Sequence, residues 1–158
     1  MAKTTQVPWY VPVGNTLTRT LLRAGFKLVG PGVVVGRYPM YLLTVRGRKS
    51  GLPRTVPVAI IARPGKRFVC APYGVVDWVR NLRAAGGAIL TRGRRSEKVV
   101  ARELARSEAV ALLREEVLAN NPFVCRYMDL SAASTPEEYD RAAASHPVFL
   151  LESAAEAG

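Results

Sequence analysis

A short basic segment of the chain contains the residue types that bind anions. Gly47-Arg48-Lys49-Ser50-Gly51 combines flexible glycines, two cations and a hydroxyl, so backbone and side-chain donors can converge on a phosphate or a carboxylate. Arg54 follows just after this turn. The spacing differs from that of a Walker P-loop, and a solvated basic hairpin tip is the alternative interpretation. The segment therefore predicts an anion site whose context the rest of the chain has to supply.

A second segment offers a flat apolar surface. Trp78 and Asn81 lie one helical turn apart with Arg80 between them, so both side chains can face the same ligand. Trp78 could flank a flat ring, whereas a buried structural Trp beside a satisfied Asn is the alternative. The two segments together suggest a ligand with both an anionic part and a ring.

The two segments resemble those of the deazaflavin-dependent nitroreductases, also called F420H2-dependent or quinone reductases. The resemblance rests on the string Gly-Arg-Lys-Ser-Gly-x-Pro-Arg at 47–54 and on Trp-x-x-Asn-Leu at 78–82. Residues 40–105 carry most of it, and the segment that starts at His146 extends it. It implies a split β-barrel that binds coenzyme F420 and passes hydride to a quinone, a nitroaromatic or an activated alkene.

The resemblance also implies which residues bind the coenzyme. Arg48, Lys49 and Ser50 would hold its phosphate and its acidic glutamate tail, and the strand that begins at Arg54 would line the deazaflavin ring. Family members often have a small polar residue and Lys where this chain has Pro72 and Tyr73. The implied coenzyme-binding residues are Arg48, Lys49, Ser50, Arg54, Thr55, Val56, Pro57, Val58, Ala59, Cys70, Ala71, Pro72, Tyr73, Asp77, Trp78, Val79, Arg80 and Asn81.

Two tyrosines are the candidate catalytic residues, because a reductase of this kind needs a proton for its acceptor. Tyr73 follows the Cys70 segment, and Tyr127 lies one helical turn after Val124, near which a family tyrosine aligns. Each could instead be a packing tyrosine with a satisfied hydroxyl. His146 has no motif-placed partner for catalysis, and we predict a structural role for it.

The elements that must position these residues follow from periodicity and turn signals. Strand runs with inserted helices, without regular βαβ alternation, favour an α+β fold with a partly closed, mostly antiparallel barrel of the FMN-binding type and flanking helices. Strands over 38–45, 55–62 and 67–71 are expected to pair sequentially. A hairpin of 88–92 with 98–104 and a last strand over 148–151 are expected to complete the sheet.

Four helices are expected in the second half of the chain. One spans 78–85, with Asp77 as its N-cap and Gly86 as its stop. Another is capped by Ser107, and a third runs from Pro122 to Tyr127. The segment Thr135-Pro136-Glu137-Glu138 has the pattern of a capping box and starts the last helix.

Residues 1–36 are predicted to be an N-terminal segment, followed by one split-barrel domain over 37–158. Within this segment Arg19, Arg23 and Lys27 lie on one face of an amphipathic helix. That face could be solvated, could cover an anionic ligand, or could contact an anionic membrane surface.

Charge is distributed unevenly along the 158 residues, which carry a net charge of +11. Residues 1–76 contain twelve Lys or Arg and no acid, whereas residues 77–158 contain eleven bases and twelve acids. Such a field attracts anions of many kinds. A nucleic-acid-binding domain fits the charge, but no recognition motif is present, so no nucleic-acid partner is expected. An FMN- or haem-binding split barrel is the other alternative, with FMN as the alternative cofactor.

Cysteine content and hydropathy indicate the compartment. Cys70 and Cys125 fit no C-x-x-C pattern and cannot complete a metal site with His146, so no metal is expected. We predict two buried free thiols, with a disulfide as the alternative. No apolar run reaches the 18 residues of a membrane span and no signal peptide is visible. These features favour a cytoplasmic protein, for which peripheral contact with an anionic membrane is the alternative. The resemblance implies a monomer or a homodimer.

Overall fold

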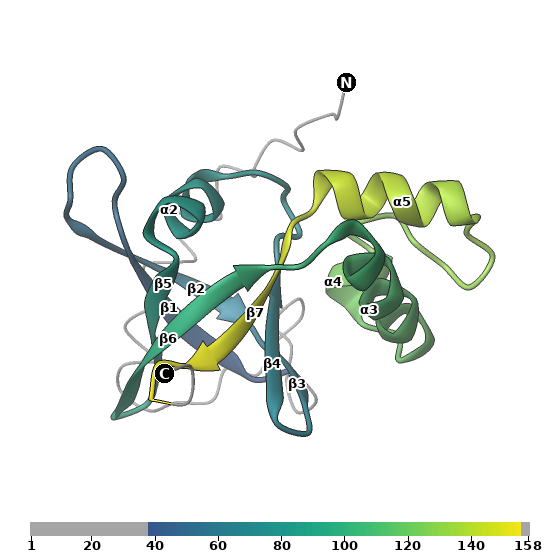
Figure 1. The fold of residues 1–158 in the computed structure, drawn as a ribbon. Coiled ribbons are helices and arrows are strands. Elements are labelled where there is room, and N and C mark those ends of the chain that lie inside the picture. The colour runs from purple at the N-terminus through teal and green to yellow at the C-terminus, as the bar shows by residue number, and fades with distance from the viewer. Residues whose placement is uncertain (1–37, 156–158) are drawn as a thin grey trace.

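The computed structural model describes residues 38–155, and its seven strands form one curled sheet (Figure 1). Neighbouring strands are all antiparallel, in the order β2-β1-β5-β6-β7-β4-β3. The strands are β1 (Met40–Arg46), β2 (Pro53–Ala59), β3 (Ile61–Arg63), β4 (Lys66–Cys70), β5 (Gly87–Arg92), β6 (Arg95–Glu103) and β7 (Val148–Ser153). The helices of the described part are α2 (Asp77–Ala85), α3 (Arg106–Leu118), α4 (Pro122–Cys125) and α5 (Pro136–Ser145). The predicted α+β fold with an antiparallel barrel is confirmed.

The two edges of the sheet are joined by a single residue. β2 and β3 occupy opposite edges, yet only Ile60 separates them in the chain. The N–H of Ile60 donates to the carbonyl of Pro39 at 3.0 Å. The predicted antiparallel pairings of 55–62 with the strands before and after it are confirmed, but the prediction of one continuous strand is wrong, because β2 and β3 lie at opposite edges. Ile60 and Ile61 are both buried but belong to different cores, so the alternation of a single strand breaks between them.

Two apolar cores occupy the two faces of β4 and β7. Phe149 and Leu151 point into the barrel, where they pack with residues such as Leu43 and Leu90. Val148 and Leu150 belong instead to the core under α3 and α5. Figure 1 shows α3, α4 and α5 grouped on one side of the barrel, apart from α2. Because both faces of β7 are covered, its sequence is a continuous apolar run rather than an alternating one.

The ends of the helices test the capping predictions. The Thr135 capping box is confirmed, because Glu138 N–H donates to Thr135 Oγ1 at 3.2 Å and Thr135 N–H donates to Glu138 Oε2 at 2.7 Å. Gly86 ends α2 in the left-handed region, as expected. The predicted caps Asp77 and Ser107 are wrong. α2 is capped by Val76 without a side-chain bond and α3 by Ala105, so Asp77 and Ser107 lie inside their helices.

The predicted basic helix within residues 1–36 lies outside the described residues. The boundary at residue 36 therefore stays a prediction. Among residues 38–155 no helix is long and apolar enough to cross a membrane.

An ion pair between β4 and β6 crosses the intervening strand β7. Arg67 donates a hydrogen bond to Glu97, and this bond lowers the pKa of the Glu97 carboxyl below its usual range. A carboxyl whose pKa is lowered on folding stabilises the fold above its unfolded pKa, and this contribution is lost as pH falls through the folded pKa.

We expect Glu97→Gln to lower the melting temperature at pH 7 and to have progressively less effect as the pH is lowered through the depressed pKa of Glu97. Thermal unfolding of both proteins between pH 7 and pH 2 measures this. Glu152→Gln removes an exposed carboxylate on β7 and is the matched control. A Glu97→Gln effect that is independent of pH would show that the pair contributes nothing through its charge.

Candidate functional site

The turn between β1 and β2 is tightly closed by its own backbone. Gly47 N–H donates to Leu52 O at 2.8 Å, and Gly51 N–H donates to Gly47 O at 2.8 Å. Gly51 has φ +72°, and a Cβ on Gly47 would lie 2.8 Å from Ser50 Oγ. Gly51 is therefore required by its left-handed backbone, and Gly47 allows the close approach of Ser50.

The N-terminal half of α2 holds this loop in place. Arg48 donates to Asn81 Oδ1 twice, from its backbone N–H at 3.1 Å and from Nη1 at 2.8 Å. Its Nη2 lies 3.3 Å from Asp77 Oδ1. Asp77 is also 3.5 Å from Arg80 Nη1. These bonds join two segments that are about thirty residues apart in the chain.

A cleft of about 580 Å³ lies where the two segments meet. Its wall contains residues from both sequence motifs, and Arg48, Lys49 and Arg54 supply positive charge against the single carboxylate of Asp77. The cleft is lined by Gly47, Arg48, Lys49, Ser50, Pro53, Arg54, Thr55, Val56, Asp77, Trp78 and Asn81. Half of the predicted coenzyme-binding residues are thus brought together. Gly47 and Pro53 also line the cleft, although neither was among the predicted coenzyme-binding residues.

Two of the cations in the cleft have no protein partner in the described part of the chain. Within residues 38–155 the side chains of Lys49 and Arg54 make no hydrogen bond or ion pair, and both residues are exposed. The Arg48 side chain, in contrast, already donates hydrogen bonds to Asn81 and Asp77 of α2. Lys49 and Arg54 are therefore the side chains that can bind an anion without losing an existing contact.

Part of the cleft wall is apolar. Trp78 is half-buried, and its ring lies 6.3 Å from that of Phe149, centroid to centroid, at an angle of 54°. Trp78 thus packs on the barrel core and also lines the cleft. This arrangement suits a flat ring beside an anion.

The other predicted coenzyme-binding residues do not line the cleft. Side chains alternate along a strand, so a contiguous motif sends some of its residues into the core. Val58, Cys70, Ala71 and Val79 are buried core residues. Ala59 packs against the core under α3 and α5, the helix-side core. Pro57, Pro72 and Tyr73 are half-buried, and Arg80 is exposed beside Asp77.

The two candidate proton donors lie against each other. The Tyr73 and Tyr127 ring centroids are 5.3 Å apart, with the rings at 71°. Phe123 stacks on Tyr127 at 6.1 Å. Val124, where the family tyrosine aligns, is fully buried in the helix-side core. Phe123 is the third member of this aromatic cluster, and no feature of the sequence predicted its place there.

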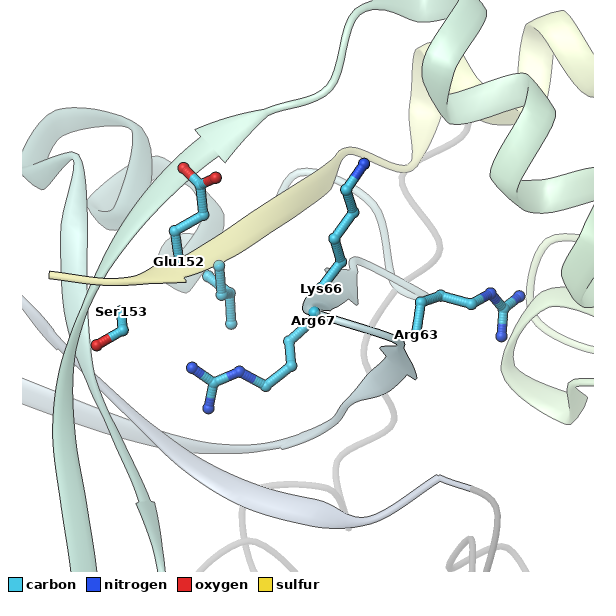
Figure 2. Close-up of a pocket in the computed structure, with 7 residues that line it drawn as sticks. Arg63, Lys66, Arg67, Glu152 and Ser153 are labelled. Carbon is cyan, nitrogen blue, oxygen red and sulfur yellow. The ribbon is translucent and has the colours of Figure 1, made fainter. Parts of the chain in front are cut away.

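A second pocket, of about 320 Å³, has a basic lining but no converging donors. Figure 2 shows that Arg63, Lys66 and Arg67 extend in different directions. Arg63 is paired with Glu116, and Arg67 with Glu97. Arg63 and Arg67 are thus already paired with carboxylates. The first cleft is therefore the better candidate for an anion site.

Burial changes the acidity of two groups named from the sequence. Burial, together with the nearby Glu116 carboxylate, raises the pKa of the Cys70 thiol to about 12. Burial also lowers the pKa of His146, whose Nδ1 lies 3.1 Å from the Ala142 carbonyl at the end of α5. Both cysteines are free as expected, although only Cys70 is fully buried. Residues 38–155 contain no cluster of three or more His, Cys, Asp or Glu placed to hold a metal ion.

Fold and cleft together define a split β-barrel protein with a basic cleft between the β1–β2 loop and α2. A model of the F420H2-dependent quinone reductase family matches residues 19–133, well over half of the chain. The chain therefore belongs to the F420H2-dependent quinone reductase family.

Solved structures agree with this assignment. An F420H2-dependent reductase, FDR-A, is 25% identical, with a TM-score of 0.52 over 72% of this chain and 94% of its own. A structure described as a domain-swapped dimer is 25% identical, with a TM-score of 0.53 over 87% of this chain and 95% of its own. Atu2129 of Agrobacterium tumefaciens, of unknown function, shares the fold at 15% identity, with a TM-score of 0.50 over 96% of this chain and 59% of its own. A search of curated proteins found no match.

The cysteines provide a direct test of the packing. The Cys70 thiol, with a pKa of about 12, is protonated at pH 8 and is also buried away from solvent. We therefore expect a thiol reagent to label the native protein only at the half-buried Cys125. Labelling stoichiometry by mass spectrometry measures this. Cys125→Ser should abolish native labelling and Cys70→Ala should leave it intact, while both thiols of the wild type should react in denaturant. Rapid native labelling of Cys125→Ser would contradict the burial of Cys70.

Proposed function

We propose that this chain is an F420H2-dependent reductase that reduces an organic acceptor by hydride transfer. The observation that supports this most is the cleft between the β1–β2 loop and α2, which Trp78 also lines and where Lys49 and Arg54 have no partner among residues 38–155. The acceptors we propose are a quinone, a nitroaromatic or an activated alkene.

The cleft residues fit an anionic coenzyme with a flat ring. Lys49 and Arg54 would bind the phosphate and carboxylates, with the Ser50 hydroxyl as a further donor. Thr55, Val56 and Trp78 would lie along the deazaflavin. A volume of about 580 Å³ also lies within the range of ~300–1,000 Å³ that ligand pockets usually have.

The chemistry asked of the protein itself is limited. When bound, reduced deazaflavin supplies the hydride. Side chains of the cleft bind and orient, and the apolar wall excludes water. An acceptor that gains a hydride also needs a proton, and we assign the hydroxyls of Tyr73 and Tyr127 as its source. Their rings contact each other edge to face, so both belong to one aromatic cluster.

Other parts of the proposal concern the molecule's surroundings. FMN is the alternative cofactor, because its phosphate would suit the same cations. We propose a cytoplasmic protein, monomeric or homodimeric, without a nucleic-acid partner. A peripheral membrane contact through Arg19, Arg23 and Lys27 would bring the protein to membrane-dissolved acceptors.

Coenzyme binding tests the cleft. Titration of the protein with F420 and, separately, with FMN, followed by fluorescence, should show saturable binding of F420. Lys49→Ala and Arg54→Ala should each weaken it by about tenfold or more, because each removes a charge-assisted hydrogen bond.

The matched controls are Arg94→Ala and Lys98→Ala, which remove exposed cations from the β5–β6 hairpin. These should leave F420 affinity within about twofold, a difference of well under 1 kcal/mol. Loss of affinity in all four variants would reduce the site to general electrostatic attraction. Binding of FMN but not F420 would replace the proposed cofactor.

The proton donors are tested by removing both hydroxyls. Tyr73→Phe combined with Tyr127→Phe should slow single-turnover oxidation of F420H2 by an acceptor about a hundredfold, since general acids typically contribute 10²–10⁴-fold. F420 affinity should stay the same. Tyr139→Phe removes a hydroxyl that bonds the Ser131 carbonyl away from the cleft and should have no effect on the rate. An unchanged rate in the double variant would remove both tyrosines from the mechanism.

A further inference from the structure

The arginine of the basic loop is arranged differently from its neighbouring cations. The Arg48 side chain is only 25% exposed, and it donates hydrogen bonds from Nη1 to Asn81 and from Nη2 to Asp77. An anion that bound the Arg48 guanidinium would have to break these hydrogen bonds. Lys49 and Arg54 make none with residues 38–155, so an anion can bind them without breaking any.

The Asn81 amide has a fixed orientation because of Arg48. Both hydrogen bonds that reach Oδ1 come from donors, so the oxygen and not the nitrogen of the amide must face Arg48. Its Nδ2 then has no partner among the described residues, although Asn81 is only 5% exposed. Asn81 lines the cleft, so this unused donor is available to an acceptor atom of a ligand that binds there.

Asp77 gives the reason why Arg48 can line the cleft without binding the anionic groups of the ligand. It is the first acid in the chain, and its carboxylate lies in a cleft that otherwise gathers cations. At 3.3 Å from Nη2 it compensates the charge of Arg48 locally. The anion-attracting charge of the cleft is therefore that of Lys49 and Arg54.

We propose that Arg48 is a positioning residue, which clamps the Asn81 amide so that its Nδ2 donates to the ligand, while Lys49 and Arg54 bind the ligand's anionic groups. This assignment rests on the proposed function for the identity of the ligand. It changes the role that the family resemblance implies for Arg48 from phosphate contact to support of a neutral donor.

Charge-conserving substitutions separate the two roles. Arg48→Lys keeps the charge but cannot bond Asn81 and Asp77 at once, because an ammonium is a point charge without the arginine fork. It should weaken F420 binding by about tenfold. Lys49→Arg keeps the charge of a direct contact and should retain affinity within about threefold. Melting temperatures of both variants check that the fold is intact.

A double-mutant cycle tests whether Arg48 acts through Asn81. Asn81→Ala should weaken F420 binding, and adding Arg48→Lys to it should cause almost no further loss, because the clamped group is already gone. In the ligand-free protein, the ¹⁵N-detected side-chain amide signal of Asn81 should move in Arg48→Lys and not in Lys49→Arg. This readout does not depend on any ligand.

The outcomes distinguish this inference from the proposed function. Wild-type affinity in Arg48→Lys, or fully additive losses in the cycle, would overturn the clamp even though F420 binds. If the wild type binds no F420, the proposed function fails, and the same variants are titrated with inorganic pyrophosphate. Retained binding in Lys49→Arg and loss in Arg48→Lys would then still support the clamp, and an unmoved Asn81 signal would overturn it.

Discussion

Closure of the sheet at Ile60 is the constraint on which the rest of the structure depends. Seven strands spaced about 4.8 Å apart would place the two edges of a flat sheet roughly 29 Å from each other. One residue spans only about 3.5 Å, so β2 and β3 can be consecutive only if the sheet curls until its edges meet. The enclosed core then includes Val79 and Leu82, which fix α2 against β1. The first turn of α2 is thereby held beside the β1–β2 loop, where Arg48 bonds it and the cleft forms.

The helix-side core depends on a buried carboxylate. Glu116 is fully buried in α3, where Arg63 of β3 pairs with it and Asn121 Nδ2 donates to it at 2.8 Å. Asn121 in turn caps α4 by accepting from Phe123 N–H at 2.9 Å. Removing one partner of such a pair leaves an uncompensated buried charge, which typically costs about 3–5 kcal/mol. The network joins an edge strand of the barrel to the short helix that precedes Tyr127, so it also supports the contact between Tyr127 and Tyr73.

Local signals in the sequence predicted local structure well. The capping box at Thr135, the stop at Gly86 and the β5–β6 hairpin depend on residues only a few positions apart, and all are confirmed. The break at Ile60 was missed because a run of apolar β-forming residues does not reveal which core each residue enters. Asp77 was read as an N-cap from its position before an apolar helix, whereas its carboxylate bonds Arg48, a partner 29 residues away in the chain. The motif located the cleft, but alternation along the strands decided which of its side chains line it.

The uneven charge along the sequence has a structural explanation in the described part of the chain. Acids from the second half pair with bases of both halves, as in Arg63 with Glu116, Arg67 with Glu97 and Arg83 with Glu103. These pairs lie on the sheet and helices away from the β1–β2 loop. Among residues 38–155, Asp77 is the acid that reaches that loop, and it pairs with Arg48 and Arg80. No other acid of the described residues lines the cleft, so the charges of Lys49 and Arg54 are not compensated there, and the positive field of the described part is strongest beside the apolar side chains of the cleft and the Asn81 amide.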